Sequence, residues 1–365
     1  MINPLLEMQG LGQSIWLDYI QRGLLTSGEL QRLIDEDGIN GVTSNPAIFE
    51  NAIVEHDDYD AAIAAMPGID ASELYERLAI QDLQQAADIL APCYTATQGR
   101  DGFVSFEVSP ELAFDTEATV CEARRLWAAL DRPNSLIKVP ATSAGVKAMQ
   151  QLIVDGINVN ATLLFGLKRY REVAQAYLDG LEIRAGQGER LASVAAVASF
   201  FLSRIDTLVD RKLDAMMPAQ AQEKVQVRGQ AAIASARLAY QEYKQLFSGD
   251  RWRKLVRAGA KTQRLLWAST STKDPAYSDI RYIEALIGAE TINTLSPGVL
   301  IAYRDHGKPA ARLEHHIDTA RNTLSELAGL GLDLDTLTEQ LEQDGVQKFS
   351  VAYQKLLANL KRRSR

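Results

Sequence analysis

Lys138 lies inside a short apolar run, Ser135–Ala141, which Pro133 and Pro140 mark off as a buried strand. An ammonium group without a partner is costly to bury, so a lysine in such a run indicates a function. Desolvation and neighbouring cations lower the pKa of a lysine, and the neutral amine then attacks a carbonyl carbon to form a Schiff base. The alternative is a lysine at a strand end whose ammonium reaches solvent or a structural carboxylate.

Three other lysines offer spare amines, but they rank below Lys138. Lys147 and Lys168 fall in helical patterns, and Lys261 falls on an expected loop.

Polar side chains recur on one face of several other strand-like runs, because alternate residues of a strand share a face. A single polar residue of this kind is usually a satisfied hydrogen bond of the core. Several strands with polar residues near their carboxyl ends instead indicate acid–base chemistry on a polyhydroxylated carbonyl compound. The sets that share a face are Asp18; Thr43 and Asn45; Ser105, Glu107 and Ser109; Asn158, Asn160 and Thr162; and Trp267, Ser269 and Ser271.

Strand-like runs alternate with amphipathic helical stretches along most of the chain, which predicts an α/β fold with a parallel sheet. Eight strands favour a closed (β/α)8 TIM barrel, although counting leaves a doubly wound sheet open. The expected strands are Ile15–Ile20, Ile39–Asn45, Gly102–Ser109, Ser135–Ala141, Ile157–Phe165, Ser193–Phe200, Arg264–Thr270 and Thr291–Ser296. The expected helices between them include Ser72–Leu90, Glu117–Leu130, Ala144–Val154, Leu167–Ile183 and Asp279–Leu286. The chain contains neither a dinucleotide-binding glycine fingerprint nor a P-loop.

The last part of the chain is predicted to be all helical, over Ala310–Leu327, Asp335–Leu341 and Val346–Lys361. In the last helix, apolar residues including Phe349 recur at helical spacing, which predicts one face laid on the barrel exterior or mouth. We therefore expect one domain over residues 1–365, with a barrel over about 12–305 and a helical extension over 306–365 packed on it.

Composition excludes several classes of protein. The 365 residues are 46% hydrophobic and carry a formal net charge of −8, so a nucleic acid or an anionic membrane is an unsuitable partner. The two cysteines suggest a reducing compartment, and the four histidines lack metal-ligand spacing. The N-terminus shows no secretion signal, and no apolar run reaches membrane-spanning length. We expect a cytoplasmic protein.

Five segments, in this order and at barrel-like spacing, resemble the transaldolases of the pentose phosphate pathway. The stretch Arg264–Thr270 and the chain length resemble the longer bacterial subfamily. The five segments are Gly41–Pro46, Val104–Ser109, Leu136–Thr142, Gly156–Phe165 and Ser199–Phe201 with Arg204–Asp206.

The resemblance implies a transferase without metal or cofactor that acts on sugar phosphates. It would move a dihydroxyacetone unit from sedoheptulose 7-phosphate to glyceraldehyde 3-phosphate, giving erythrose 4-phosphate and fructose 6-phosphate. Members of the family occur as monomers and homodimers, and no feature of this sequence chooses between the two states.

The resemblance also implies catalytic roles for four residues. Lys138 matches the Schiff-base lysine, and Asp18 matches the carboxylate that takes the proton of the C4 hydroxyl when the C3–C4 bond breaks. Glu107 and Thr162 match the pair that positions a water molecule for proton transfer.

Substrate-binding roles follow in the same way. Asn45 and Asn160 match the amides that hold the dihydroxyacetone moiety, Ser199 matches a sugar-binding hydroxyl, and Arg204 matches a phosphate-binding guanidinium. Arg204 also has a structural alternative, because it and Asp206 begin a helical stretch and could pair with each other.

Two positions bear on specificity. Phe201 stands where related fructose 6-phosphate aldolases carry tyrosine, and an apolar ring there favours transfer over release. After the seventh strand, familiar members carry Ser-x-Arg, whereas this chain has Ser269 followed by no arginine up to Lys273. We hypothesise that Lys273 supplies the missing charge as a point cation; the alternative is a solvated loop lysine.

Two other functions stay open at this point. One is a class I aldolase or another lysine-dependent lyase on the same barrel, which would release dihydroxyacetone without an acceptor. The other is a barrel that serves only as a binding or regulatory protein, since barrels host unrelated functions.

Overall fold

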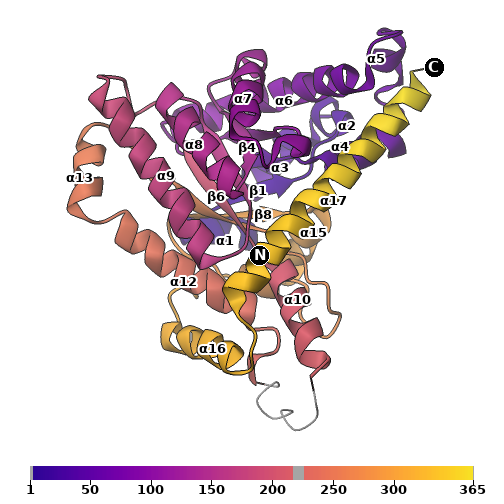
Figure 1. The fold of residues 1–365 in the computed structure, drawn as a ribbon. Helices are drawn as coiled ribbons and strands as arrows, with labels where there is room; N and C mark the ends of the chain where they lie inside the picture. The colour runs from indigo at the N-terminus through magenta and orange to yellow at the C-terminus, as the bar shows by residue number, and fades with distance from the viewer. Residues whose placement is uncertain (1–2, 217–225, 365) are drawn as a thin grey trace.

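The computed structural model describes residues 3–216 and 226–364, and its centre is a closed barrel of eight parallel strands (Figure 1). The barrel prediction is therefore confirmed, and the doubly wound alternative is wrong. Each expected strand is present, with ends that differ from the expected ones by a few residues. The strands are β1 (Gln13–Asp18), β2 (Ile39–Thr43), β3 (Phe103–Glu107), β4 (Ser135–Pro140), β5 (Val159–Leu164), β6 (Ala196–Phe201), β7 (Arg264–Ala268) and β8 (Thr291–Leu295).

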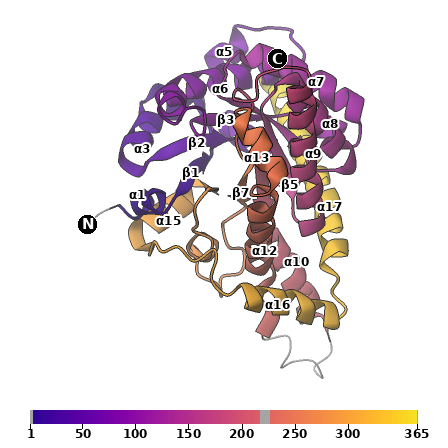
Figure 2. The same cartoon turned by 90° about the vertical axis from the view of Figure 1, so that its left-hand side faces the viewer.

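Helices follow the strands and cover the outside of the barrel (Figures 1 and 2). The outward-facing strand residues are consequently as buried as the inward-facing ones, as in other parallel sheets. The helices before the C-terminal extension are α1 (Pro4–Gly10), α2 (Arg22–Thr26), α3 (Glu29–Asp37), α4 (Pro46–Glu55), α5 (Asp60–Ala64), α6 (Ala71–Ala96), α7 (Thr116–Leu130), α8 (Ser143–Asp155), α9 (Leu167–Gly186), α10 (Ser203–Asp214), α12 (Ala231–Leu246), α13 (Asp250–Arg257), α14 (Arg281–Ala285) and α15 (Pro297–His306).

Capping residues fix where the chain turns from strand to helix at the carboxyl end of the barrel. Asn45 caps α4 by accepting a 3.0 Å hydrogen bond from the Ile48 amide, with Pro46 in the first turn. Thr142 caps α8 by accepting from the Gly145 amide at 2.9 Å. These short connections keep the strand ends of β2 and β4 close to the barrel mouth.

The C-terminal extension differs from its prediction in two places. The first helix, α16 (Ile317–Gly329), begins later than Ala310, because the amides of Arg312 and Leu313 donate to the Ile287 carbonyl and residues 313–316 form a turn. The second and third predicted helices form one helix, α17 (Leu334–Arg363).

Gly345 lies within α17 and does not break it. A Cβ atom at Gly345 would approach Leu163 Cδ2 to 3.0 Å, so the glycine permits close packing of α17 on β5.

α17 crosses the molecule beside α4 and α10 and reaches over the barrel mouth (Figures 1 and 2). Asn359 donates to Glu50 of α4 at 3.0 Å, and the Tyr353 ring packs edge-on against Tyr75 of α6 at 5.8 Å. Phe349 is buried on the face toward the barrel. The prediction that an apolar face of this helix lies on the barrel mouth is confirmed.

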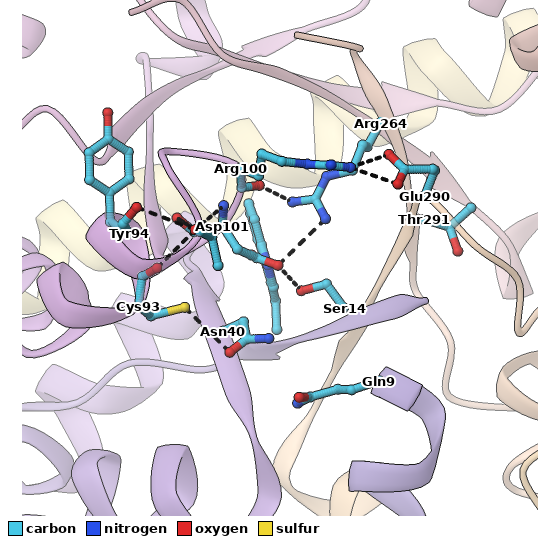
Figure 3. Close-up of polar contacts among 12 residues, drawn as sticks. Gln9, Ser14, Asn40, Cys93, Tyr94, Arg100, Asp101, Arg264, Glu290 and Thr291 are labelled. Carbon is cyan, nitrogen blue, oxygen red and sulfur yellow. Dashed lines mark hydrogen bonds and ion pairs between the residues drawn. The ribbon is translucent and has the colours of Figure 1, made fainter. Parts of the chain in front are cut away.

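Buried polar contacts of Asp101 close the opposite, amino-terminal end of the barrel. Asp101 accepts hydrogen bonds from the Ser14 hydroxyl and, at 2.7 Å, from Trp16 Nε1, and Arg264 lies 3.5 Å away (Figure 3). The Trp16 ring fills the lumen next to Gly41, where a Cβ atom would lie 2.5 Å from it. The lumen is packed at this end, so chemistry is confined to the other.

Across residues 3–216 and 226–364, no helix is long and apolar enough to cross a membrane. In the same ranges, no three histidine, cysteine, aspartate or glutamate side chains group closely enough to hold a metal ion.

Candidate active site

A pocket of about 170 Å³ opens at the carboxyl ends of the strands, where barrel enzymes build their sites. It brings together nine of the eleven residues that the sequence suggested. These are Asp18, Asn45, Lys138, Thr162, Ser199, Phe201, Arg204, Ser269 and Lys273. The other two, Glu107 and Asn160, lie immediately behind its wall, as described below.

Lys138 is the buried amine of the pocket. Its side chain is 5% exposed, and Nζ donates to the Ser44 carbonyl at 3.0 Å. Nζ also lies 3.7 Å from Glu107 Oε2, within ion-pair range but beyond hydrogen-bond distance. A single carbonyl acceptor leaves most of the amine's hydrogen-bonding capacity available to a substrate.

Glu107 pairs with Lys138 in register on the neighbouring strand and is fully enclosed. Neither of its carboxylate oxygens finds a hydrogen-bond partner in the described part of the chain, and the same holds for the Thr162 hydroxyl. Burial raises the pKa of Glu107 to about 7, although the Lys138 charge opposes the rise. A carboxyl group with a pKa near neutrality serves as acid and as base at physiological pH.

Asp18 stands at the end of β1 on the other side of the pocket and is partly exposed. The Thr43 hydroxyl donates to Asp18 Oδ1 at 2.7 Å, and it lies 2.9 Å from the Thr294 hydroxyl. This chain of hydroxyls holds the carboxylate through one of its two oxygens.

Asn160 supports the wall of the pocket from behind. It is fully buried, donates to Ser105 Oγ at 3.1 Å and accepts from Ser199 Oγ at 2.6 Å. Asn160 therefore orients Ser199 but does not line the pocket itself. Ser199 and Asn45 both line it.

Arg204 begins α10 and points its guanidinium between two aromatic rings. Its Cζ lies 5.4 Å from the Phe201 ring centroid and 5.9 Å from that of Phe349, and Nη1 is buried without a hydrogen-bond partner among the described residues. Burial lowers the pKa of Arg204. The suggested pairing with Asp206 is wrong, because Asp206 accepts instead from the Ala232 amide and the Tyr282 hydroxyl, each at 2.8 Å.

Ser269 and Lys273 form the rim after β7. Ser269 Oγ lies 2.8 Å from Ser203 Oγ, and the exposed Lys273 donates to Ser271 Oγ at 2.8 Å. Lys273 lines the pocket and makes no ion pair with a carboxylate of the described residues.

The prediction of which β7 side chains face the pocket is wrong for Trp267. Leu266 and Ala268 line the pocket, whereas Trp267 points outward, donates to the Leu286 carbonyl at 3.1 Å and packs edge-on against Phe200. Ser269 has a φ of 55°, which breaks the alternation and brings its side chain back to the pocket.

Sequence reasoning missed Phe349 and Thr294 as residues of the site. Phe349 reaches the pocket from α17, with its ring centroid 6.0 Å from Lys138 Nζ. Its apolar spacing marked it as a packing residue, and only the docking of α17 shows what it covers. Thr294 continues the hydroxyl face of the strands, and the alternation along β8 could have indicated it.

A closed parallel barrel with a polar pocket and a buried amine at its carboxyl end is the architecture of a (β/α)8-barrel enzyme. Residues 15–360 match the family described as transaldolase/fructose-6-phosphate aldolase. A transaldolase of Trichodesmium erythraeum is 46% identical over 369 residues, covering 98% of this chain and 97% of its own. A transaldolase of Thiobacillus denitrificans is 48% identical over 356 residues, covering 97% of this chain and 98% of its own. The chain belongs to the transaldolase/fructose-6-phosphate aldolase family and is an enzyme, a transferase of the transaldolase type, as its motifs predict.

Proposed function

We propose that Lys138 forms a Schiff base with a ketose phosphate and that the enzyme thereby transfers a dihydroxyacetone unit. Sedoheptulose 7-phosphate is the donor and glyceraldehyde 3-phosphate the acceptor, with erythrose 4-phosphate and fructose 6-phosphate as products of this pentose phosphate pathway step. One observation carries the proposal. The buried Lys138 amine opens into the same pocket as Asp18 and has the carboxylate of Glu107 at 3.7 Å.

In the first step, the amine of Lys138 adds to the C2 carbonyl, and the resulting carbinolamine loses water to give an iminium ion. The departing hydroxyl needs a proton, and the same water must return for hydrolysis. In this proposal Glu107 and the Thr162 hydroxyl, which have no hydrogen-bond partner among the described residues, hold that water. With a pKa of about 7, Glu107 donates the proton in one direction and accepts it in the other.

In the second step, the C3–C4 bond breaks and its electron pair moves to the iminium, leaving an enamine on Lys138. The C4 hydroxyl proton goes to Asp18 as the aldehyde product departs. The enamine then attacks the acceptor aldehyde, whose oxygen takes the proton back from Asp18. The Thr43 hydroxyl holds Asp18 in place for both transfers.

Between these events the enamine must be kept from a stray proton and from hydrolysis. The Phe349 ring lies 6.0 Å from Lys138 Nζ, Phe201 lines the same pocket, and neither ring carries a hydrogen-bonding group. Neither ring can donate a proton to the enamine, which supports transfer over release.

The remaining polar residues bind the rest of the sugar. In this proposal Asn45 and Ser199 contact hydroxyls of the dihydroxyacetone moiety, while Asn160 acts through Ser199. Arg204, with Ser269 and Lys273 on the rim, receives the substrate phosphate. The unsatisfied Nη1 of Arg204 is a donor for which a phosphate oxygen is a suitable acceptor.

The whole chain acts as one catalytic domain in this proposal, because α17 of the extension supplies Phe349 to the barrel pocket. We place the enzyme in the cytoplasm. All the groups that the mechanism uses come from one chain, so a monomer and a homodimer would both be active.

The test is borohydride trapping with fructose 6-phosphate, followed by peptide mass spectrometry. We expect a reduced dihydroxyacetone adduct on Lys138 and none in Lys138→Met, with Lys147→Met as the matched control that keeps the adduct. An adduct on another lysine would discard this assignment of the site. No adduct under conditions where the sugar phosphate binds would refute the Schiff-base mechanism.

A further inference from the structure

The largest cleft among those described lies at the amino-terminal end of the barrel, away from Lys138. Its volume is about 720 Å³, against about 170 Å³ for the catalytic pocket. It lies between α12, α13 and the first residues of β3, β6 and β7, and none of the proposed catalytic or substrate-binding residues lines it. A ligand there would not enter the transfer reaction.

A row of aromatic rings forms one wall of this amino-terminal cleft. Tyr240 and Tyr243 stack at 5.7 Å with 16° between their planes, Tyr243 and Phe247 lie 5.1 Å apart, and Phe247 meets Trp252 edge-on at 5.0 Å. α12 carries the tyrosines, Phe247 follows it directly, and Trp252 comes from α13. The four rings are 4% to 8% exposed, so a flat apolar ligand would contact the part of each ring that lines the cleft.

Basic side chains also line this cleft, in a protein whose net charge is −8. Arg100 is held by Glu290 at 2.6 Å, and Arg264 lies 3.5 Å from Asp101 (Figure 3). Lys244 pairs with Glu314. Each of these cations therefore has a carboxylate partner inside the protein.

Lys261 differs from the other cations of the amino-terminal cleft. Its Nζ donates to the Gly99 carbonyl at 3.1 Å, and no carboxylate of residues 3–216 and 226–364 forms an ion pair with it. Partial burial and the neighbouring Arg100 charge lower the pKa of Lys261. A bound anion would relieve this repulsion and give the ammonium the partner that the protein does not supply.

We propose that the amino-terminal cleft is a second binding site, for a small organic anion with a flat aromatic body. The anionic group meets Lys261 between Arg100 and Arg264, and the ring lies on the Tyr243–Trp252 wall. Charge and shape agree in this assignment, because basic and aromatic side chains line the same space. A neutral aromatic ligand would leave the Lys261 charge unmatched, and a small inorganic anion would leave the aromatic wall unused.

The test uses anilinonaphthalene sulfonate, an aromatic sulfonate, in calorimetric titrations of the full-length enzyme. We expect one saturable site. Lys261→Met should weaken binding roughly tenfold or more, since a charge-assisted contact is lost. Lys261→Arg should restore most of the affinity, and Lys147→Met removes a lysine charge elsewhere on the surface as the matched control. Circular dichroism and thermal melting of each variant show that it is folded.

Reduction with borohydride and fructose 6-phosphate provides the second control, because it blocks the catalytic pocket. The trapped enzyme should bind the sulfonate as before, and Lys261→Met should keep its transferase activity. Equal affinity in wild type and Lys261→Met, or loss of binding on trapping, would overturn the proposal. The comparison of Lys261→Met with the wild type needs no trapping and does not depend on which residue is the nucleophile, so the second site and the proposed function fail separately.

Discussion

Replacing Glu107 by glutamine should change how the free energy of unfolding depends on pH. Burial raises the pKa of this carboxyl group from its ordinary value of 4.5 to about 7. Between these two values the unfolded chain has released the proton and the folded chain still holds it. Stability of the wild type therefore falls as pH rises through this window, because the unfolded state binds fewer protons there.

The size of the effect follows from the same two values. The difference between 4.5 and about 7, at roughly 1.4 kcal/mol for each pKa unit, amounts to about 3 kcal/mol. Glu107→Gln has nearly the same shape but no proton to release. Its free energy of unfolding, minus that of the wild type, should therefore rise by about 3 kcal/mol between about pH 4 and about pH 8.

Urea unfolding of both proteins at a series of pH values measures this difference. Other titrating groups cancel in the subtraction, and Glu326→Gln, which alters an exposed side chain on α16, is the matched control. A difference that stays constant with pH would show that Glu107 is ionised in the folded enzyme well below neutrality. The proton-transfer role proposed for it would then lose its physical basis.

Three further predictions concern Lys273 at the rim of the pocket, Phe349 of α17 beside Lys138, and Gly41 at the amino-terminal end of the lumen. Lys273→Ala should raise KM for phosphorylated substrates roughly three- to tenfold, and Lys273→Arg should restore it; an unchanged KM would remove this lysine from the site. Phe349→Ala should increase the release of free dihydroxyacetone without an acceptor relative to transfer, because water reaches Lys138 more easily; an unchanged ratio, measured by coupled assays, would show that the ring only packs. Gly41→Ala should destabilise the fold by about 1–3 kcal/mol in urea unfolding, since the new Cβ would lie 2.5 Å from the Trp16 ring; unaltered stability would mean that this ring shifts freely.

The sequence was sufficient for the barrel and for most of the pocket, because both depend on local patterns. The alternation of side chains along each strand placed Glu107, Lys138 and Asn160 on the inner face, and the parallel register then aligned them as neighbours. Any residue that lies on the same face as Lys138, near the carboxyl end of its own strand, is brought to the same end of the barrel. No knowledge of side-chain packing is needed for that step.

The errors arise where backbone geometry departs from the pattern. A left-handed φ at Ser269 interrupts the alternation of β7, so parity predicted the wrong face for Trp267. Leu163 also has a positive φ, and the register between β5 and β6 shifts beside it. Neither residue is a glycine, so the sequence gives no sign of either turn.

Phe349 was unpredictable as a site residue for a different reason. Its helix reaches the barrel mouth only because contacts such as Asn359 with Glu50 hold α17 against α4. Those contacts join residues far apart in the chain, and an apolar helical face does not state what it will cover. Periodicity identified the surface, and only the tertiary structure identified its partner.

The lumen holds two buried carboxylates, one at each end, which differ in how many hydrogen bonds they accept. Asp101, at the closed end, accepts hydrogen bonds from Ser14 and Trp16 and has Arg264 nearby. These contacts use its charge to stabilise the amino-terminal end of the barrel. Glu107, at the open end, has the Lys138 ammonium at 3.7 Å, and both its oxygens lack hydrogen-bond donors in the described part of the chain. A buried carboxylate that lacks hydrogen-bond donors destabilises the folded state. A carboxylate with all its hydrogen bonds made would have no proton available for transfer. The unsatisfied group is therefore the one from which proton transfer is expected, and its position beside Lys138 is the strongest structural support for the proposed chemistry.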